Sequence, residues 1–262
     1  MNLLDALILG LVQGLTEFLP VSSSGHLVMA ETFLDVPSAG IFVEVALHVA
    51  TLLSVVIVYR ARLAELALGT LRRDPDALRY VALLALATVP AAVVGLTLKD
   101  LVERAFATPA LTGFMLLFTG AFLWSTRYVQ RPVVDEPAGP KVALAMGFAQ
   151  ALALLPGISR SGATITAGLW GRASGVRAAE FSFLMSIPAI IGAAILEARN
   201  FEGAVSDVGG APLLVAFFAA LAAGILAIRS LVWLLRRQSF YAFAYYVWAA
   251  GALFLLLLWL RG

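Results

Sequence analysis

The chain has 262 residues, of which 61% are hydrophobic and only 13% are charged, and its formal net charge is +2. Ordinary soluble domains carry about 25% charged residues, so this composition excludes a soluble globular protein and predicts an all-α polytopic membrane protein. The absence of cysteine excludes a disulfide framework and a cysteine-ligated metal.

Residues 3–34 form the first apolar region, and the sequence "LPVSSSG" interrupts it near its middle. We do not expect a cleaved signal peptide, because no Lys or Arg precedes the apolar run and Asp5, Gln13 and Glu17 interrupt it. Three uninterrupted candidate spans follow this region. A second broken region, 142–170, contains "LPGISRSG", and three further spans come after it.

Each uninterrupted span is about 17–25 residues long, which at 1.5 Å per residue is enough to cross a hydrocarbon core of about 30 Å. Span 41–59 holds two ionisable residues, Glu44 and His48, which we expect to support packing or a cavity rather than to react. The six expected spans are residues 41–59, 80–98, 110–126, 180–198, 213–235 and 240–260.

The two broken regions match each other without a gap when the sequence is shifted by 137 positions. The similarity predicts an internal duplication within a single membrane domain, 1–262, with residues 1–137 as the first repeat and 138–262 as the second. The polar and glycine positions that match are Gly10 with Gly147, Gln13 with Gln150, Ser22 with Ser159, Ser24 with Ser161, and Gly25 with Gly162.

The charges of the loops predict an orientation. Arginine and lysine outnumber acidic residues in some loops and not in others, and the positive-inside rule places the basic loops in the cytoplasm. The basic, cytoplasmic loops are 60–79, 127–141, 171–179 and 229–239, and the external loops are 99–109 and 199–212.

Every loop lies on its predicted side of the membrane if each broken region is a re-entrant hairpin. Because three spans follow each hairpin, the two repeats are then inverted, with the first hairpin entering from outside and the second from the cytoplasm. The fold prediction is therefore an inverted repeat with two re-entrant helical hairpins, about 3–34 and 142–170, plus six spanning helices. Irregular backbone at membrane depth must be buried or line a cavity, so we expect the two breaks to line one.

The two breaks concentrate polar side chains. Each break is expected to start a half-helix whose N-terminus carries roughly +0.5 charge and unpaired N–H groups. Two such ends with Arg160 between them would bind an anion, and the planar guanidinium suits phosphate. A lone charge at mid-membrane costs about 2.5–3.5 kcal/mol, so Arg160 and Glu17 need a function or partners. The clustered residues are Gln13, Glu17, Ser22, Ser23, Ser24 and His26 in the first break, and Gln150, Ser159, Arg160, Ser161 and Thr164 in the second.

Structural alternatives stay open at this point. Each serine could bond to its own helix, His26 could be a satisfied polar residue, and Glu17 and Arg160 could neutralise each other. Gln13 and Gln150 could pair across the repeats. The clustering nevertheless favours phosphate ester chemistry, in which a serine attacks phosphorus, His26 or Glu17 manages its proton, and Arg160 holds the developing charge. Glu17 could also hold a divalent cation.

At these residues the chain resembles the undecaprenyl-diphosphate phosphatase family of the bacitracin-resistance type, over essentially its whole length. Two long motifs carry the resemblance: Gln13 to Glu17 followed by "PVSSSGH" at 20–26, and "PGISRSGAT" at 156–164. The resemblance implies a hydrolase that removes one phosphate from undecaprenyl diphosphate, a C55 polyprenyl diphosphate, and thereby recycles the lipid carrier of cell-wall peptidoglycan synthesis.

The resemblance also implies roles for residues. Glu17 would be the essential carboxylate, Ser23 the nucleophile, His26 its proton partner and Arg160 the phosphate clamp. The expected cofactor is Mg²⁺ or Ca²⁺ with Glu17 as a metal ligand, although Gln13 replaces a carboxylate in the first motif. The residues expected to bind substrate are Gln13, Ser22, Ser24, Gly157, Ser159, Ser161 and Thr164.

The implied location is the inner (plasma) membrane of a bacterium, with the cavity facing the periplasm or outside. The expected partners are a polyprenyl diphosphate and membrane lipids, with no nucleic acid and with room for a homodimer. A second superfamily of lipid phosphatases needs a histidine after its Ser-Arg motif, and the chain has none after His48. The remaining alternative is a transporter or flippase of an anionic polyprenyl lipid, because inverted repeats with broken helices are typical of transporters.

Overall fold

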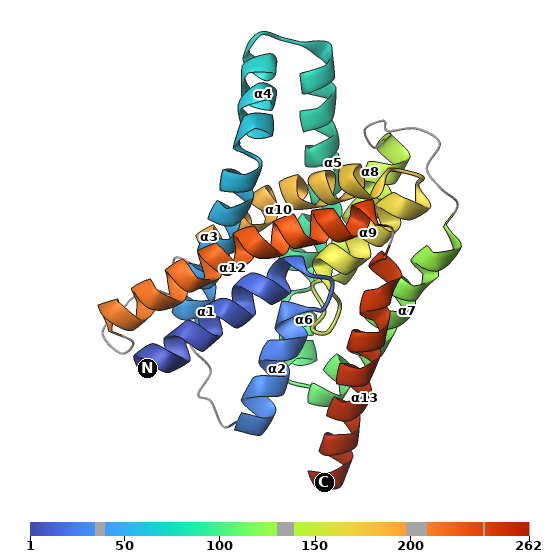
Figure 1. The fold of residues 1–262 in the computed structure, drawn as a ribbon. Helices are drawn as coiled ribbons and strands as arrows, with labels where there is room; N and C mark the ends of the chain where they lie inside the picture. Colours follow the sequence, from blue (N-terminus) through green and yellow to red (C-terminus); the bar gives the residue numbers. More distant parts are fainter. Residues whose placement is uncertain (35–39, 130–138, 198–208, 238, 262) are drawn as a thin grey trace.

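The computed structural model describes residues 1–34, 40–129, 139–197, 209–237 and 239–261 (Figure 1). Within these ranges the chain forms α-helices and short 3-10 turns, with no strand. Five helical stretches in the same ranges are long and apolar enough to cross a membrane, and a bent pair, Val45–Val58 with Arg60–Leu71, gives a sixth if it counts as one span. The prediction of an all-α polytopic membrane protein is therefore confirmed. The five stretches are Pro75–Thr97, Pro109–Tyr128, Gly175–Gly192, Gly210–Arg236 and Phe240–Arg261.

Six helices lie close to the six predicted spans. Two of them, α5 and α10, begin earlier than expected. In α5 the Asp74 side chain accepts the Asp76 N–H and Pro75 occupies the first helical turn. Two segments expected as loops contain short helices, α4 (Arg60–Leu71) and α6 (Lys99–Phe106). The six helices are α3 (Gly40–Val58), α5 (Pro75–Thr97), α7 (Pro109–Ser125), α10 (Gly175–Glu197), α12 (Gly210–Arg236) and α13 (Phe243–Arg261).

The chain bends by 76° between α3 and α4. Beyond the bend α4 projects from the helical body together with the start of α5 (Figure 1). Arg62 of α4 pairs with Glu65 at 2.9 Å and with Glu180 of α10 at 3.1 Å, and the Tyr80 hydroxyl of α5 donates to Glu180 at 3.3 Å. These polar contacts fix α4 against α5 and α10 at one end of the body.

Each broken region consists of two helices around a stretch of irregular backbone: α1 (Leu3–Phe18) and α2 (Ser23–Leu34), then α8 (Pro140–Leu152) and α9 (Arg160–Trp170). α1 ends where Leu19 takes an extended conformation, as a residue before proline prefers. In the second break Gly157 has a φ of 92°, and a Cβ there would collide with a carbonyl oxygen of α7. Both breaks thus fall at the predicted proline- and glycine-containing stretches.

The helices before the two breaks each pack on a helix from a distant part of the sequence. α1 lies along α12, as Figure 1 shows, and α8 lies along α5. The approach of α1 is close, because a Cβ at Gly10 or Gly14 would collide with carbonyl oxygens of α12. Phe18, at the end of α1, meets Phe183 of α10 edge to face with ring centroids 5.4 Å apart. These contacts place the first break in the interior of the helical body.

Candidate functional site

The two breaks, far apart in sequence, lie against each other in the structure. Ser161 donates its hydroxyl to the Leu19 carbonyl at 3.2 Å, and Arg160 forms an ion pair with Glu17 at 2.7 Å. A Cβ built on Gly25 would lie 3.2 Å from the Gly157 backbone. The structure therefore brings the first-break and second-break residues into one site.

Glu17 lies at the centre of this site and is only 8% exposed. Its Oε1 accepts a hydrogen bond from Arg160 Nη2 at 2.7 Å. Its Oε2 accepts from the Ser23 hydroxyl at 3.0 Å and from Gln13 Nε2 at 3.1 Å. His48 Nε2 of α3 lies 3.8 Å from the same oxygen. A buried carboxylate needs such partners, because its desolvation is otherwise costly.

The flanking serines have a different task, since they cap the helices that follow. Ser22 Oγ accepts the Gly25 N–H at 3.1 Å, and Ser159 Oγ accepts the Gly162 N–H at the same distance. Each capping hydroxyl also lies 3.3 Å from a second serine, Ser24 in the first break and Ser161 in the second. The matching caps satisfy N–H groups that would otherwise be unpaired at helix starts.

Ser23 and Arg160 occupy the corresponding position between these paired serines. Ser23 directs its hydroxyl at Glu17, whereas Arg160 gives Nη2 to Glu17 and keeps Nη1 buried with no hydrogen-bond partner among the described residues. An unpaired buried donor is costly. On a charged guanidinium, such an unpaired N–H group indicates a place where an anionic ligand would accept a hydrogen bond.

Two expected substrate-binding residues face elsewhere. The Thr164 hydroxyl lies 2.6 Å from that of Ser182 on α10 and donates to the Arg160 carbonyl at 2.7 Å. Gly157 offers its carbonyl to the Thr119 hydroxyl at 2.8 Å, and that hydroxyl accepts the Ser159 N–H at 3.2 Å. Thr164 and Gly157 therefore support the second break rather than line the space beside Glu17.

His26 lies on α2, three residues after Ser23, and its two ring nitrogens contact residues other than Ser23. Its Nδ1 is 2.8 Å from the Ser22 carbonyl, and its Nε2 is 2.7 Å from the hydroxyl of Tyr246 on α13. In the described part of the chain Glu17, not His26, is thus the hydrogen-bond acceptor of Ser23. The sequence pointed to neither Tyr246 nor Thr119, because both lie in apolar spans without a neighbouring motif.

The two glutamines at matching positions do not pair with each other. Gln13 donates to Glu17, whereas both polar atoms of Gln150 are buried and have no partner among the described residues. The hypothesis of hydrogen bonding across the repeats is therefore wrong for these side chains. Glu44, expected to support the cavity, has a side chain outside the described part of the structure.

Oxygen ligands for a metal are few. No group of three or more His, Asp or Glu side chains within the described ranges could hold an ion. Mg²⁺, however, is often bound through one or two carboxylates together with substrate phosphates. Gln13 donates its side-chain N–H to Glu17, which leaves its amide oxygen as a further ligand. Glu17 and this oxygen therefore fit a divalent ion only if substrate phosphates supply the other ligands.

A comparison with family models decides the affiliation. The model described as "Bacitracin resistance protein BacA" matches residues 6–253. The chain belongs to this family. Several curated proteins similar to the chain are named undecaprenyl-diphosphatase. That of Desulfatibacillum aliphaticivorans is 39% identical over 96% of this chain and 97% of its own length. Undecaprenyl-diphosphatase 3 of Bacillus cereus is 40% identical over 98% of each chain, and the Carboxydothermus hydrogenoformans protein is 39% identical over 98% of each.

Proposed function

We propose that this BacA-family protein is an undecaprenyl-diphosphate phosphatase, which hydrolyses undecaprenyl diphosphate to undecaprenyl phosphate and phosphate. The observation that carries the proposal is a serine–carboxylate–arginine array: Ser23 donates to Glu17, and Glu17 pairs with an arginine that keeps one buried N–H group for an anion. Relatives of about 40% identity bear the name of this activity. The reaction would recycle the lipid carrier for cell-wall synthesis and so contribute to bacitracin resistance.

In the first chemical step the Ser23 oxygen attacks the terminal phosphorus, and the bond from that phosphorus to the bridging oxygen breaks. Glu17 takes the serine proton and passes it to the departing undecaprenyl phosphate. In the second step water attacks the phosphoserine, its proton returns through Glu17 to Ser23, and phosphate leaves. Both proton transfers use the hydrogen bond that already joins Ser23 to Glu17.

Arg160 and the helix starts would stabilise the charge on the transferred phosphoryl group. Nη1 of Arg160 is the unpaired donor, and α2 and α9 both begin at the site. Donors already oriented in a dry site lower the energy of a charged transition state without reorganisation. We propose His26 as a second proton carrier, since it follows Ser23 by three residues and shares its face of α2.

The remaining residues are proposed to bind substrate or to shape the site. Gln13 orients Glu17, and the serine caps fix the two helix starts. Glu17 would hold a Mg²⁺ or Ca²⁺ ion, which would supply positive charge to neutralise the phosphates. The proposed substrate-binding set is Gln13, Ser22, Ser24, Ser159 and Ser161, whereas Gly157 and Thr164, also expected to bind substrate, are proposed to support the second break.

Purified protein in detergent should release phosphate from undecaprenyl diphosphate, and EDTA should lower the rate at least about tenfold, because the ion shared with substrate would be removed. Added Mg²⁺ or Ca²⁺ should restore it. The measurement is phosphate release with a colorimetric assay. A protein that releases no phosphate with any metal, yet moves polyprenyl lipid between leaflets of vesicles, would be the transporter instead; the family affiliation does not favour that alternative.

The proposed membrane arrangement is the inverted repeat, with the re-entrant hairpins 3–34 and 142–170 meeting at the site. The packing supports it. A shift of 137 positions carries α5 onto α12, and the contact of α1 with α12 then corresponds to that of α8 with α5. The matching serine caps follow the same relation. We further propose a bacterial inner membrane with the cavity open to the outside, surrounding lipids as partners, and a homodimer as the assembly.

Cysteine labelling tests this topology, and the cysteine-free sequence makes single substitutions unambiguous. Cysteines at Arg73 and at Lys141 should react only with reagents that reach the cytoplasm, because both positions lie in loops rich in arginine or lysine. A cysteine at Glu103 should react from outside. Both ends of region 3–34 should also react from outside, and finding them on opposite sides would make the region a plain span. A cysteine in segment 202–207, which lies outside the described residues, should likewise react only from outside.

A further inference from the structure

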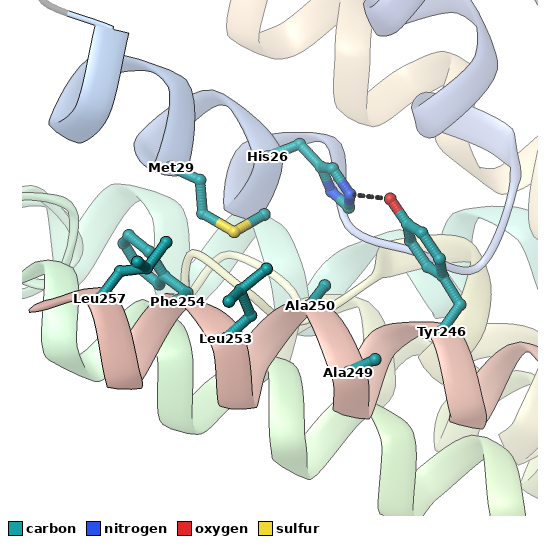
Figure 2. Close-up of a pocket in the computed structure, with 8 residues that line it drawn as sticks. All are labelled: His26, Met29, Tyr246, Ala249, Ala250, Leu253, Phe254 and Leu257. Carbon is teal, nitrogen blue, oxygen red and sulfur yellow. Dashed lines mark hydrogen bonds between the residues drawn. The ribbon is translucent and has the colours of Figure 1, made fainter.

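A groove of about 360 Å³ lies between α2 and α13, beside the site (Figure 2). Its polar end is formed by His26 and Tyr246. Beyond this end its walls are apolar, with Met29 on α2 facing small and branched side chains of α13, among them Ala250, Leu253 and Leu257. An apolar groove that starts at a polar pair suits a ligand with a polar head and a hydrocarbon chain.

The polar end of the groove is continuous with the reaction centre. His26 follows Ser23 by three residues on α2, so the two side chains lie on one face of the helix. Ser23 in turn donates to Glu17. A molecule whose phosphate lies at Ser23 would therefore have its next atoms beside His26 and the rest of its length along the groove.

The two helices that form the groove are tied at both ends. His26 Nε2 lies 2.7 Å from the Tyr246 hydroxyl, and the two rings are parallel with centroids 5.7 Å apart. At the far end Arg261 donates to the Thr32 carbonyl at 2.6 Å. Between these ties the small side chain of Ala250 lies on α13 between Leu253, which faces Met29, and Tyr246 (Figure 2). Hydrogen bonds between α2 and α13 thus bridge the groove at both of its ends.

We propose that this groove binds the first isoprenoid units of the substrate's polyprenyl chain, with the His26–Tyr246 pair at the junction of diphosphate and chain. The inference rests on the proposed function and adds the surface that distinguishes a long prenyl chain from a short one. Close van der Waals packing against the groove walls, rather than removal from water, favours a chain that extends along the groove. Because Leu253 and Leu257 on the apolar wall are exposed, the chain leaves the groove into the surrounding lipid.

Filling the groove should reduce the preference for long chains. In Ala250→Phe, the ratio of kcat/KM for undecaprenyl diphosphate to kcat/KM for isopentenyl diphosphate, a single isoprene unit, should fall at least about tenfold. The matched control is Ala252→Phe, an exposed alanine on α13 outside the groove, which should leave the ratio unchanged. An unchanged ratio in Ala250→Phe, or an equal fall in both variants, would overturn the proposal.

Photocrosslinking gives a second measurement that needs no bulky change inside the groove. A photoreactive amino acid at Leu253, which lines the groove, should capture radiolabelled undecaprenyl diphosphate, whereas one at Leu256 should not; the native leucines are 56% and 51% exposed. Equal capture at both positions, or capture that phospholipid displaces as well as unlabelled substrate does, would show a general lipid contact and contradict the proposal. If the unmodified protein released no phosphate, the proposed function would fail, while the crosslinks would still decide the occupant.

Discussion

Glu17→Gln should lower phosphate release from undecaprenyl diphosphate by about 10²–10⁴-fold, the usual contribution of a positioned acid–base group. The neutral amide cannot take the Ser23 proton. It also removes the charge that holds Arg160 Nη2 at 2.7 Å, so the guanidinium would lose its orientation toward the transferred phosphate. Both effects act in the reaction rather than in substrate binding alone, so the loss should appear mainly in kcat.

The glutamine has nearly the same shape, and we expect the helical fold to persist, as circular dichroism and size-exclusion chromatography in detergent would show. Glu103→Gln is the matched control, because that carboxylate is 62% exposed and pairs only with Lys99 in the described structure. It should keep full activity. More than a tenth of the wild-type rate in a folded Glu17→Gln protein would rule out the proposed role of the carboxylate.

Ser23→Ala should lower activity on the order of 10³-fold or more, since removal of a nucleophile abolishes its covalent route. Ser24→Ala should cost less than about tenfold. The two serines are adjacent, yet their contacts differ: Ser23 donates to Glu17, whereas Ser24 lies 3.3 Å from the capping hydroxyl of Ser22. Initial rates of phosphate release from both variants provide the test.

The comparison of neighbouring serines controls for the local backbone, because both residues lie in the first turn of α2. The Ser24 hydroxyl contacts the capping hydroxyl of Ser22. Removal of a capping side chain itself costs about 0.5–2 kcal/mol of stability, so loss of the Ser24 hydroxyl should cost less. If Ser24→Ala proved the more damaging change, the assignment of Ser23 as nucleophile and Ser24 as support would be wrong.

Much of the helical arrangement was predictable because its causes are local. Proline, glycine and serine clustered together end helices, so "LPVSSSG" and "LPGISRSG" marked both breaks, whereas the single prolines Pro90 and Pro188 lie inside α5 and α10. The length of apolar runs located the spans, with α3 and α12 as close matches. The ion pair of Glu17 with Arg160 could also be anticipated as one alternative, because an isolated charge at that depth is unfavourable and these two were the nearest candidates.

Contacts that depend on the side-chain geometry of distant helices could not be predicted. Tyr246 reaches His26 from a position 220 residues away, and Thr119 holds the second break from the middle of α7. The sequence therefore left open whether His26 or Glu17 accepts the Ser23 hydroxyl. In the structure Glu17 accepts it, while His26 contacts Tyr246. The bend after α3 had no proline or glycine at Tyr59 to mark it.

The packing of α1 against α12 has a consequence for biogenesis. Gly10 and Gly14 make backbone contact with a helix that the ribosome delivers about 200 residues later. While the chain is being inserted, α1 has no native partner for its glycine face, and the carboxylate of Glu17 lacks Arg160 as well. The early part of the chain must therefore be held, by lipid or by the insertion machinery, until nearly all of the protein has been translated. Premature termination before α12 would leave Gly10 and Gly14 of α1 without their partner helix in the membrane.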